Sequence, residues 1–70
     1  MTTRIYDVPA ISCEHCQRAI EGEVTQVPGV TGATVTLDAR TVRVDGDATD
    51  SAIRAAIDRA GYDVLGVTEL

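Results

Sequence analysis

Long apolar runs, lysine, phenylalanine and tryptophan are all missing from this chain of 70 residues. A helix that spans a membrane needs about 18 or more consecutive apolar residues, and no segment approaches that length. The first seven residues also lack the apolar stretch of a signal peptide. We therefore expect a soluble, cytoplasmic protein with no membrane partner.

The charge balance and the aromatic content argue against a nucleic-acid partner. Eleven acidic residues against six arginines give a formal net charge of -5, which is opposite in sign to the charge that a phosphate backbone attracts. Tyr6 and Tyr62 are the whole complement of Phe, Tyr and Trp. The chain therefore offers no platform on which bases could stack.

The short chain also argues against an enzyme. A domain of about 60 residues buries only about 60% of its extended-chain surface, so a deep cleft with many catalytic groups is not expected. No linker, low-complexity tract or composition shift interrupts the sequence. We predict one domain, residues 1–70, whose chemistry lies near its surface.

Hydrophobic spacing divides the chain into six elements, because apolar residues recur at helical spacing in two segments and alternate with polar residues in the others. Pro28–Gly29 and Gly61 are expected to end the two helices, and Gly46–Asp47 to end the third strand. Ser12 and Thr49 are residues of the type that caps a helix N-terminus. The predicted order is strand 4–8, helix 14–26, strand 33–37, strand 41–45, helix 50–60 and strand 64–68.

This order predicts an α+β fold made of a split pair of βαβ units. Both helices carry one apolar stripe, and the middle strands have one apolar face. Burial of these faces requires both helices on the same side of a four-stranded antiparallel sheet. The other face, with Thr34, Thr36 and Arg43, is expected to be exposed to solvent. The predicted core residues are Tyr6, Ile20, Val24, Val35, Val42, Ile53 and Ile57.

The residues that could carry chemistry are two cysteines, Cys13 and Cys16, with Glu14 and His15 between them. They lie at the start of the first predicted helix, where backbone N–H groups favour thiolate over thiol. Two sulfurs at this spacing can close on one metal ion, and thiolate selects Cu(I) and other soft metals over Mg²⁺ or Ca²⁺. A disulfide between them would close too short a loop to stabilise the fold much.

Paired cysteines at this spacing also occur in other kinds of site. The alternatives are a thioredoxin-like redox site, part of a zinc site, or a pair of small buried hydrophobic residues. A structural zinc site needs four ligands, whereas this chain offers only His15 close to the cysteines. Structural zinc held by one chain is therefore not expected.

The sequence resembles the heavy-metal-associated domain family, which is found in bacterial copper chaperones, mercury-binding proteins and the N-terminal modules of metal-pumping P-type ATPases. The family motif Gly-Met-Thr/Ser-Cys-x-x-Cys corresponds to Ala10–Cys16, which reads Ala-Ile-Ser-Cys-Glu-His-Cys. The likeness extends to the 27–30 connection and the 60–62 loop. It implies a ferredoxin-like βαββαβ fold, in agreement with the predicted order of elements, and makes Cys13 and Cys16 the metal ligands.

The resemblance also implies roles for the residues around the ligands. Ile11 stands where the family has a buried Met that supports the metal loop, and the Ile side chain can fill the volume of that Met. Ala10 stands where the family has Gly. Tyr62 resembles the loop tyrosine that lies over the metal site in bacterial copper chaperones; packing at the edge of the core is the alternative. Ser12 is a further neighbour of the site. His15 is expected to be exposed and to act only through its charge.

Three acidic residues, Asp45, Asp47 and Asp50, lie between the third strand and the second helix. They lack the spacing of a calcium-binding loop. We expect a solvated loop and helix start there rather than a second metal site.

Together these features predict a Cu(I) chaperone rather than an enzyme. Two thiolates hold one Cu(I) in an exposed, under-coordinated geometry, and a partner's cysteine takes the ion by stepwise ligand exchange. The resemblance implies a metal-transporting P-type ATPase, or its metal-binding domain, as the partner. A metal-bridged homodimer is a further expected species.

Three alternatives stay open. The first is a carrier of Zn²⁺, Cd²⁺ or Hg²⁺, although Ser12 before Cys13, in place of an added acidic residue, favours copper over zinc. The second is an N-terminal module of a metal-transporting P-type ATPase. The third is a thiol-disulfide oxidoreductase, against which the short chain and the missing substrate groove argue.

Overall fold

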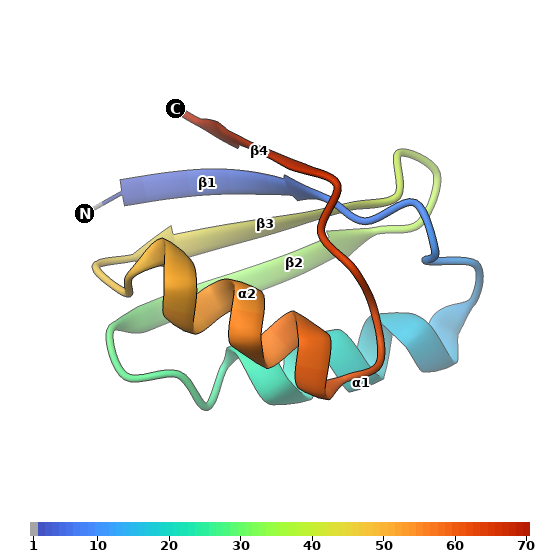
Figure 1. Ribbon diagram of the computed structural model, residues 1–70, viewed down its shortest axis with the longest axis horizontal. Coiled ribbons are helices and arrows are strands. Elements are labelled where there is room, and N and C mark those ends of the chain that lie inside the picture. The colour runs from blue at the N-terminus through green and yellow to red at the C-terminus, as the bar shows by residue number, and fades with distance from the viewer. Residues whose placement is uncertain (1) are drawn as a thin grey trace.

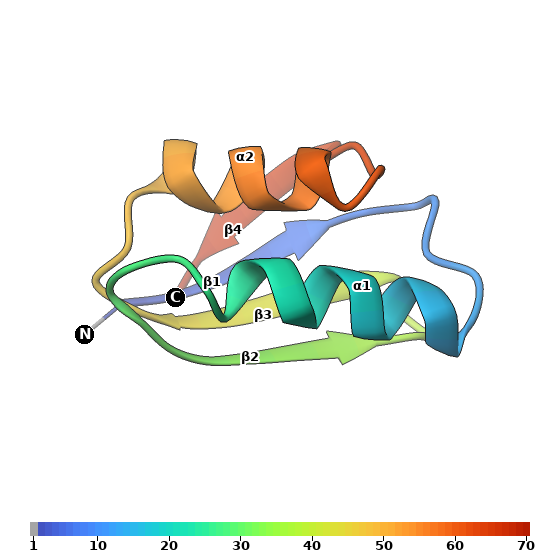
Figure 2. The ribbon, with the colours of Figure 1, turned by 90° about the horizontal axis from the view of Figure 1, so that it is seen from below.

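The computed structural model describes residues 2–70 and has the predicted α+β architecture. Its elements are β1 (Thr2–Asp7), α1 (Glu14–Val24), β2 (Val30–Thr36), β3 (Thr41–Gly46), α2 (Asp50–Arg59) and β4 (Gly66–Glu69). The strands form one antiparallel sheet in the order β2-β3-β1-β4 (Figure 1). Both helices lie on the same face of this sheet (Figure 2). The expected ferredoxin-like βαββαβ fold is therefore confirmed.

The first helix is shorter than predicted. We expected it to reach Gln26, but α1 ends at Val24. Pro28 disfavours a helical conformation of the residue before it, and the chain tightens into a turn in which the Val27 N–H donates to the Val24 carbonyl at 3.1 Å. Val27 is still buried, so its apolar spacing was read correctly although it lies beyond the helix.

The strand ends also differ from the predicted ranges, by no more than three residues at either end. Gly46, which was expected to break the third strand, belongs to β3 and pairs with both Thr2 and Val30. The last strand begins at Gly66 rather than at Val64. Backbone pairing decides these ends, and side-chain alternation does not report it.

The core lies between the helix pair and the sheet, as predicted. The exposed face of the sheet carries Thr34, Thr36 and Arg43. Neither α1, with 11 residues, nor α2, with 10, has the length and apolar content of a membrane-crossing helix; these are the helices of residues 2–70. The residues with no exposed surface include Tyr6, Val8, Ile11, Ile20, Val24, Val42, Ile53 and Ile57, and Val35 is also buried.

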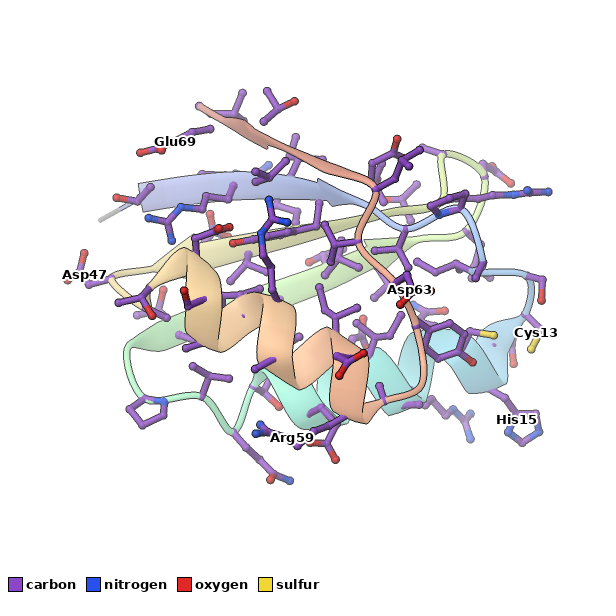
Figure 3. The ribbon with its side chains drawn as sticks, in the orientation of Figure 1. Cys13, His15, Asp47, Arg59, Asp63 and Glu69 are labelled. Atoms are coloured by element: carbon purple, nitrogen blue, oxygen red, sulfur yellow. The ribbon has the colours of Figure 1, made fainter. Side chains whose placement is uncertain are left out.

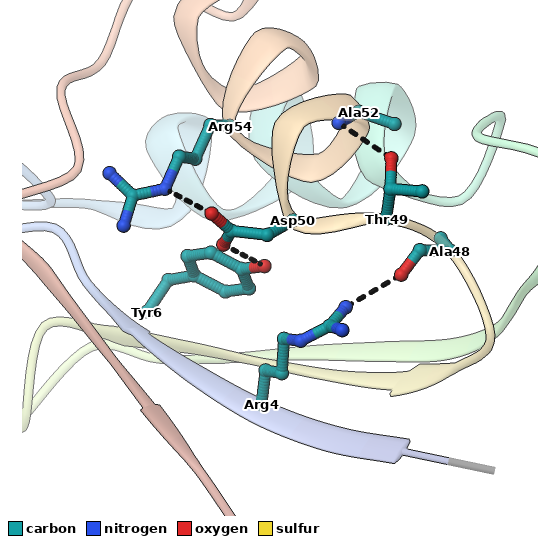
Figure 4. Close-up of polar contacts among 7 residues, drawn as sticks. All are labelled: Arg4, Tyr6, Ala48, Thr49, Asp50, Ala52 and Arg54. Atoms are coloured by element: carbon teal, nitrogen blue, oxygen red, sulfur yellow. Dashed lines mark hydrogen bonds and ion pairs between the residues drawn. The ribbon is translucent and has the colours of Figure 1, made fainter.

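Asp50 binds the one polar atom of the buried Tyr6 side chain, a role that we did not predict for this acidic residue. The Tyr6 hydroxyl donates to Asp50 Oδ1 at 2.9 Å, and Arg54 Nε donates to Asp50 Oδ2 at 2.8 Å (Figure 4). Burial, and then this hydrogen bond, raise the pKa of Tyr6 to about 12. Thr49 caps α2 as predicted, because its hydroxyl accepts from the Ala52 N–H at 3.2 Å.

Candidate metal centre

The loop between β1 and α1 holds the first cysteine at the surface. Ile11 has no exposed surface and fixes the middle of this loop to the core. Cys13 follows in an extended conformation, with φ of -159° and ψ of 173°, and is the N-cap of α1 without a side-chain capping bond. Ser12 is therefore not the cap that its residue type suggested. Its hydroxyl lies 3.9 Å from the sulfur of Cys16 instead.

The two cysteine sulfurs lie together at one end of the molecule. Their Sγ atoms are 3.5 Å apart, and both residues are free thiols. Cys13 is exposed and its sulfur points outward beyond the start of α1 (Figure 3), whereas Cys16 is 6% exposed. A pair of purely structural buried hydrophobic residues is therefore ruled out for Cys13. One sulfur is open to an incoming group, and the other is held by the fold.

Tyr62 lies in the loop after α2, and the pKa shifts of Tyr62 and Cys16 link their side chains. Gly61, with φ of 95°, ends that helix as predicted, and the Tyr62 N–H donates to the Ile57 carbonyl at 3.2 Å. The ring of Tyr62 also packs against the core. Packing at the edge of the core, the alternative to a position over the metal site, is therefore present. A position of Tyr62 over a bound metal stays a prediction.

The environment of Cys16 favours its thiolate. A hydrogen bond from the Tyr62 hydroxyl is the largest cause, and one from the Ser12 backbone is the next; together they lower the pKa of Cys16 from its ordinary value of 9.0 to about 6, although burial opposes the shift. The same contact raises the pKa of Tyr62. This environment therefore favours the Cys16 thiolate, which is the form that soft metal ions bind.

Within residues 2–70, no third candidate ligand lies beside the cysteine pair. His15 is exposed and projects from α1 away from Cys13 (Figure 3). Among residues 2–70 no group of three His, Cys, Asp or Glu side chains is placed to hold one ion. Within the same residues, none of Asp45, Asp47 and Asp50 belongs to such a group. The arrangement brings two thiols together, with no third such group placed beside them among residues 2–70.

One contact of the cysteine loop was missed by the sequence analysis. The Val8 N–H donates to the Arg40 carbonyl at 3.0 Å, and Arg40 Nη1 donates to the Pro9 carbonyl at 3.4 Å. Arg40 lies in the turn between β2 and β3, and 31 residues separate it from Pro9. No local motif signals such a contact, because it depends on the register of the sheet.

The metal-free, reduced protein is expected to gain stability as pH rises from about 6 to 9. Between the folded pKa of Cys16, about 6, and its ordinary value of 9.0, the unfolded state binds more protons, so raising the pH favours the folded state. Urea unfolding at several pH values measures this slope. Tyr62→Phe should reduce the slope and Cys16→Ser should remove this part of it. An unchanged slope in Tyr62→Phe would exclude the phenol hydroxyl as its source.

Comparison with known proteins identifies the family of the chain. The model of the heavy-metal-associated domain matches residues 5–63. A copper chaperone CopZ of Staphylococcus epidermidis is 42% identical over an alignment of 67 positions, which covers 91% of this chain and 98% of that protein. The solved structure of a CopZ metallochaperone superposes with a TM-score of 0.86 and 36% identity, covering 90% of this chain and 98% of the other.

A domain of a larger protein has the same fold. It is the N-terminal domain of a potential copper-translocating P-type ATPase from Bacillus subtilis, solved in the Cu(I)-loaded state, with a TM-score of 0.82 and 28% identity over 97% of this chain and 92% of that one. The family match spans both helices and the cysteine pair. From its fold, its sequence and its relatives, this chain belongs to the heavy-metal-associated domain family.

Proposed function

We propose that this protein is a copper chaperone that binds one Cu(I) between Cys13 and Cys16 and passes it to a partner by ligand exchange. The observation that carries the proposal is the pair of free thiols, 3.5 Å apart, of which one is exposed and the other has a pKa of about 6. Two soft ligands without a third suit Cu(I) better than Zn²⁺, which takes four. The relatives named as copper chaperones support this choice of metal.

Metal binding in a linear geometry requires the two sulfurs to move slightly apart. Two metal–sulfur bonds of about 2.3 Å, the length found for zinc, span about 4.6 Å when they lie in line. The present separation of 3.5 Å is shorter. Cys16 is buried and Cys13 is exposed, so we assign the movement of about 1 Å to the side chain of Cys13.

Transfer follows from the same difference between the two cysteines. A partner's thiolate approaches from the side of Cys13 and forms a three-sulfur intermediate around the ion. The bond to Cys13 then breaks, and a second partner thiolate displaces Cys16. Copper stays Cu(I) throughout, because thiolates only replace thiolates. Each partner thiol releases one proton, and each freed cysteine takes up a proton according to its pKa.

The proposed partner is a metal-transporting P-type ATPase or its metal-binding domain. The support is the likeness to the N-terminal domain of a potential copper-translocating ATPase. That likeness also keeps open a second arrangement, in which this chain is itself such a module. With a net charge of -5, the chain should favour a partner whose docking face is basic. We place transfer in the cytoplasm, where cysteines stay reduced.

Competition between metals tests the proposal. Reduced protein is titrated under anaerobic conditions with Cu(I) and with Zn²⁺, each against a chelator of known affinity, while native mass is recorded. We expect one Cu(I) per monomer and much weaker Zn²⁺ binding. Tighter Zn²⁺ binding would favour the zinc carrier, and catalytic turnover of a disulfide substrate would favour an oxidoreductase. A mass of two chains per ion would identify the metal-bridged homodimer.

Replacing His15 by alanine is expected to change the Cu(I) affinity at neutral pH by less than about threefold, which is about 0.7 kcal/mol. The exposed imidazole points away from Cys13 and completes no group of three ligands in the described chain. Chelator competition on both proteins measures the difference. A loss above about tenfold would make His15 a ligand and would return zinc to consideration.

A further inference from the structure

The turn between β2 and β3 has an unusual backbone at Arg40. Its φ is 55°, and no other residue of the described chain except glycine has a positive φ. Glycine adopts this left-handed conformation with less strain than any residue that has a side chain. The geometry of the turn therefore does not explain why arginine is present. An explanation has to come from what the side chain touches.

The contacts of Arg40 lead to the cysteine loop. Its carbonyl accepts from the Val8 N–H at 3.0 Å, and its Nη1 donates to the Pro9 carbonyl at 3.4 Å. Val8 in turn accepts from the Ile11 N–H at 3.1 Å. Val8 and Ile11 have no exposed surface, whereas Pro9 between them is exposed. Arg40 thus reaches the exposed part of the loop that precedes Cys13.

We propose that Arg40 is a positioning residue for the cysteine loop, and that its guanidinium, bound to the Pro9 carbonyl, slows the exchange of a metal ion from Cys13. The inference rests on the proposed function for the identity of the ion. The backbone bond to Val8 and the buried Ile11 side chain hold the two ends of the exposed segment. The guanidinium adds the side-chain restraint between them, so its loss should loosen the loop without unfolding the protein.

Four variants separate this role from charge and from global stability. Arg40→Gly removes the guanidinium and keeps the left-handed backbone, and Arg40→Asn, which also tolerates that backbone, replaces it if the glycine variant fails to fold. Arg40→Lys retains a charged donor. Arg43→Gln is the matched control for charge, because Arg43 lies on the exposed face of the sheet and its side chain is 57% exposed.

Amide hydrogen exchange in the metal-free protein tests the restraint without any metal. We expect the Ile11 amide to exchange at least about threefold faster in Arg40→Gly than in the parent, with the Val44 amide of β3 unchanged. Arg43→Gln should match the parent, and Arg40→Lys should lie within about twofold of it. An unchanged Ile11 rate, or equal acceleration at Val44, would overturn the inference.

Transfer of Cu(I) to an excess of a thiol chelator tests the consequence. We expect Arg40→Gly to release the ion about three- to tenfold faster, equivalent to about 0.7–1.4 kcal/mol in the barrier. Equal rates in the parent and Arg40→Gly, or equal acceleration in Arg43→Gln or Arg40→Lys, would overturn the positioning role and leave the proposed function intact. A parent that binds no Cu(I) would overturn the proposed function, and with it the effect on metal release.

Discussion

Replacing Cys16 by serine is expected to weaken Cu(I) binding by at least about a thousandfold, or about 4 kcal/mol. Serine supplies a hard oxygen that stays protonated at neutral pH, whereas Cys16 supplies a buried thiolate with a pKa of about 6. The remaining Cys13 is a single soft ligand, and one thiolate cannot supply a linear pair. Anaerobic competition with a Cu(I) chelator measures the loss.

Controls separate this loss of binding from a loss of structure. Cys13→Ser should reduce affinity to a similar extent, whereas Ser12→Ala removes only a hydroxyl that lies 3.9 Å from the Cys16 sulfur and should retain tight binding. The fold should persist in both serine variants, because the core does not depend on metal. Retention of tight one-to-one binding by monomeric Cys16→Ser would disprove the two-thiolate site, and an unfolded metal-free variant at 25 °C would disprove the independence of the fold.

The fold could be predicted because its side chains alternate or recur at regular spacing. Ile53, Ala56 and Ile57 mark one face of a helix, and all three are buried in α2. The exact strand ends could not be predicted in this way. Gly46 has the composition of a strand breaker, yet it pairs with Thr2 and Val30, which are distant in sequence. Hydrogen bonds of the backbone determine such ends, and they leave no pattern in side-chain hydropathy.

The candidate site could also be predicted only in part, and for the same reason. The spacing of Cys13 and Cys16 at a helix start predicted that the thiols would meet, and they lie 3.5 Å apart. Tyr62 entered only through resemblance to a family, because its contact with Cys16 depends on how α2 is placed on the sheet. Arg40 left no signal, since its carbonyl and guanidinium reach the loop only after β2 and β3 have paired. A site formed by residues close in sequence can be predicted from their spacing. Contacts between distant segments can be found only once the arrangement of the sheet and helices is known.

Replacing Gly46 by alanine is expected to destabilise the protein by more than about 4 kcal/mol, a loss of exceptional size for one methyl group. Gly46 has a φ of 131°, and an added Cβ would overlap the Gly29 carbonyl oxygen and lie 2.8 Å from the Thr31 nitrogen. These are backbone atoms, so rotation of a side chain cannot relieve the overlap. The Gly29 carbonyl also accepts from the Asp47 N–H at 2.9 Å, and its displacement would break that bond.

A domain of this size has a total stability of about 4–10 kcal/mol, so Gly46→Ala should lose much or all of its stability at 25 °C, which urea titration followed by circular dichroism measures. Gly22→Ala is the matched control. Gly22 lies on the exposed side of α1, and an added Cβ there meets no atom within 4 Å. Alanine should stabilise that helix by about 0.5–1 kcal/mol. Similar stabilities for the two variants would show that the close approach of Gly46 to the backbone of residues 29–31 is not rigid. This approach lies at the end of the sheet opposite the cysteines.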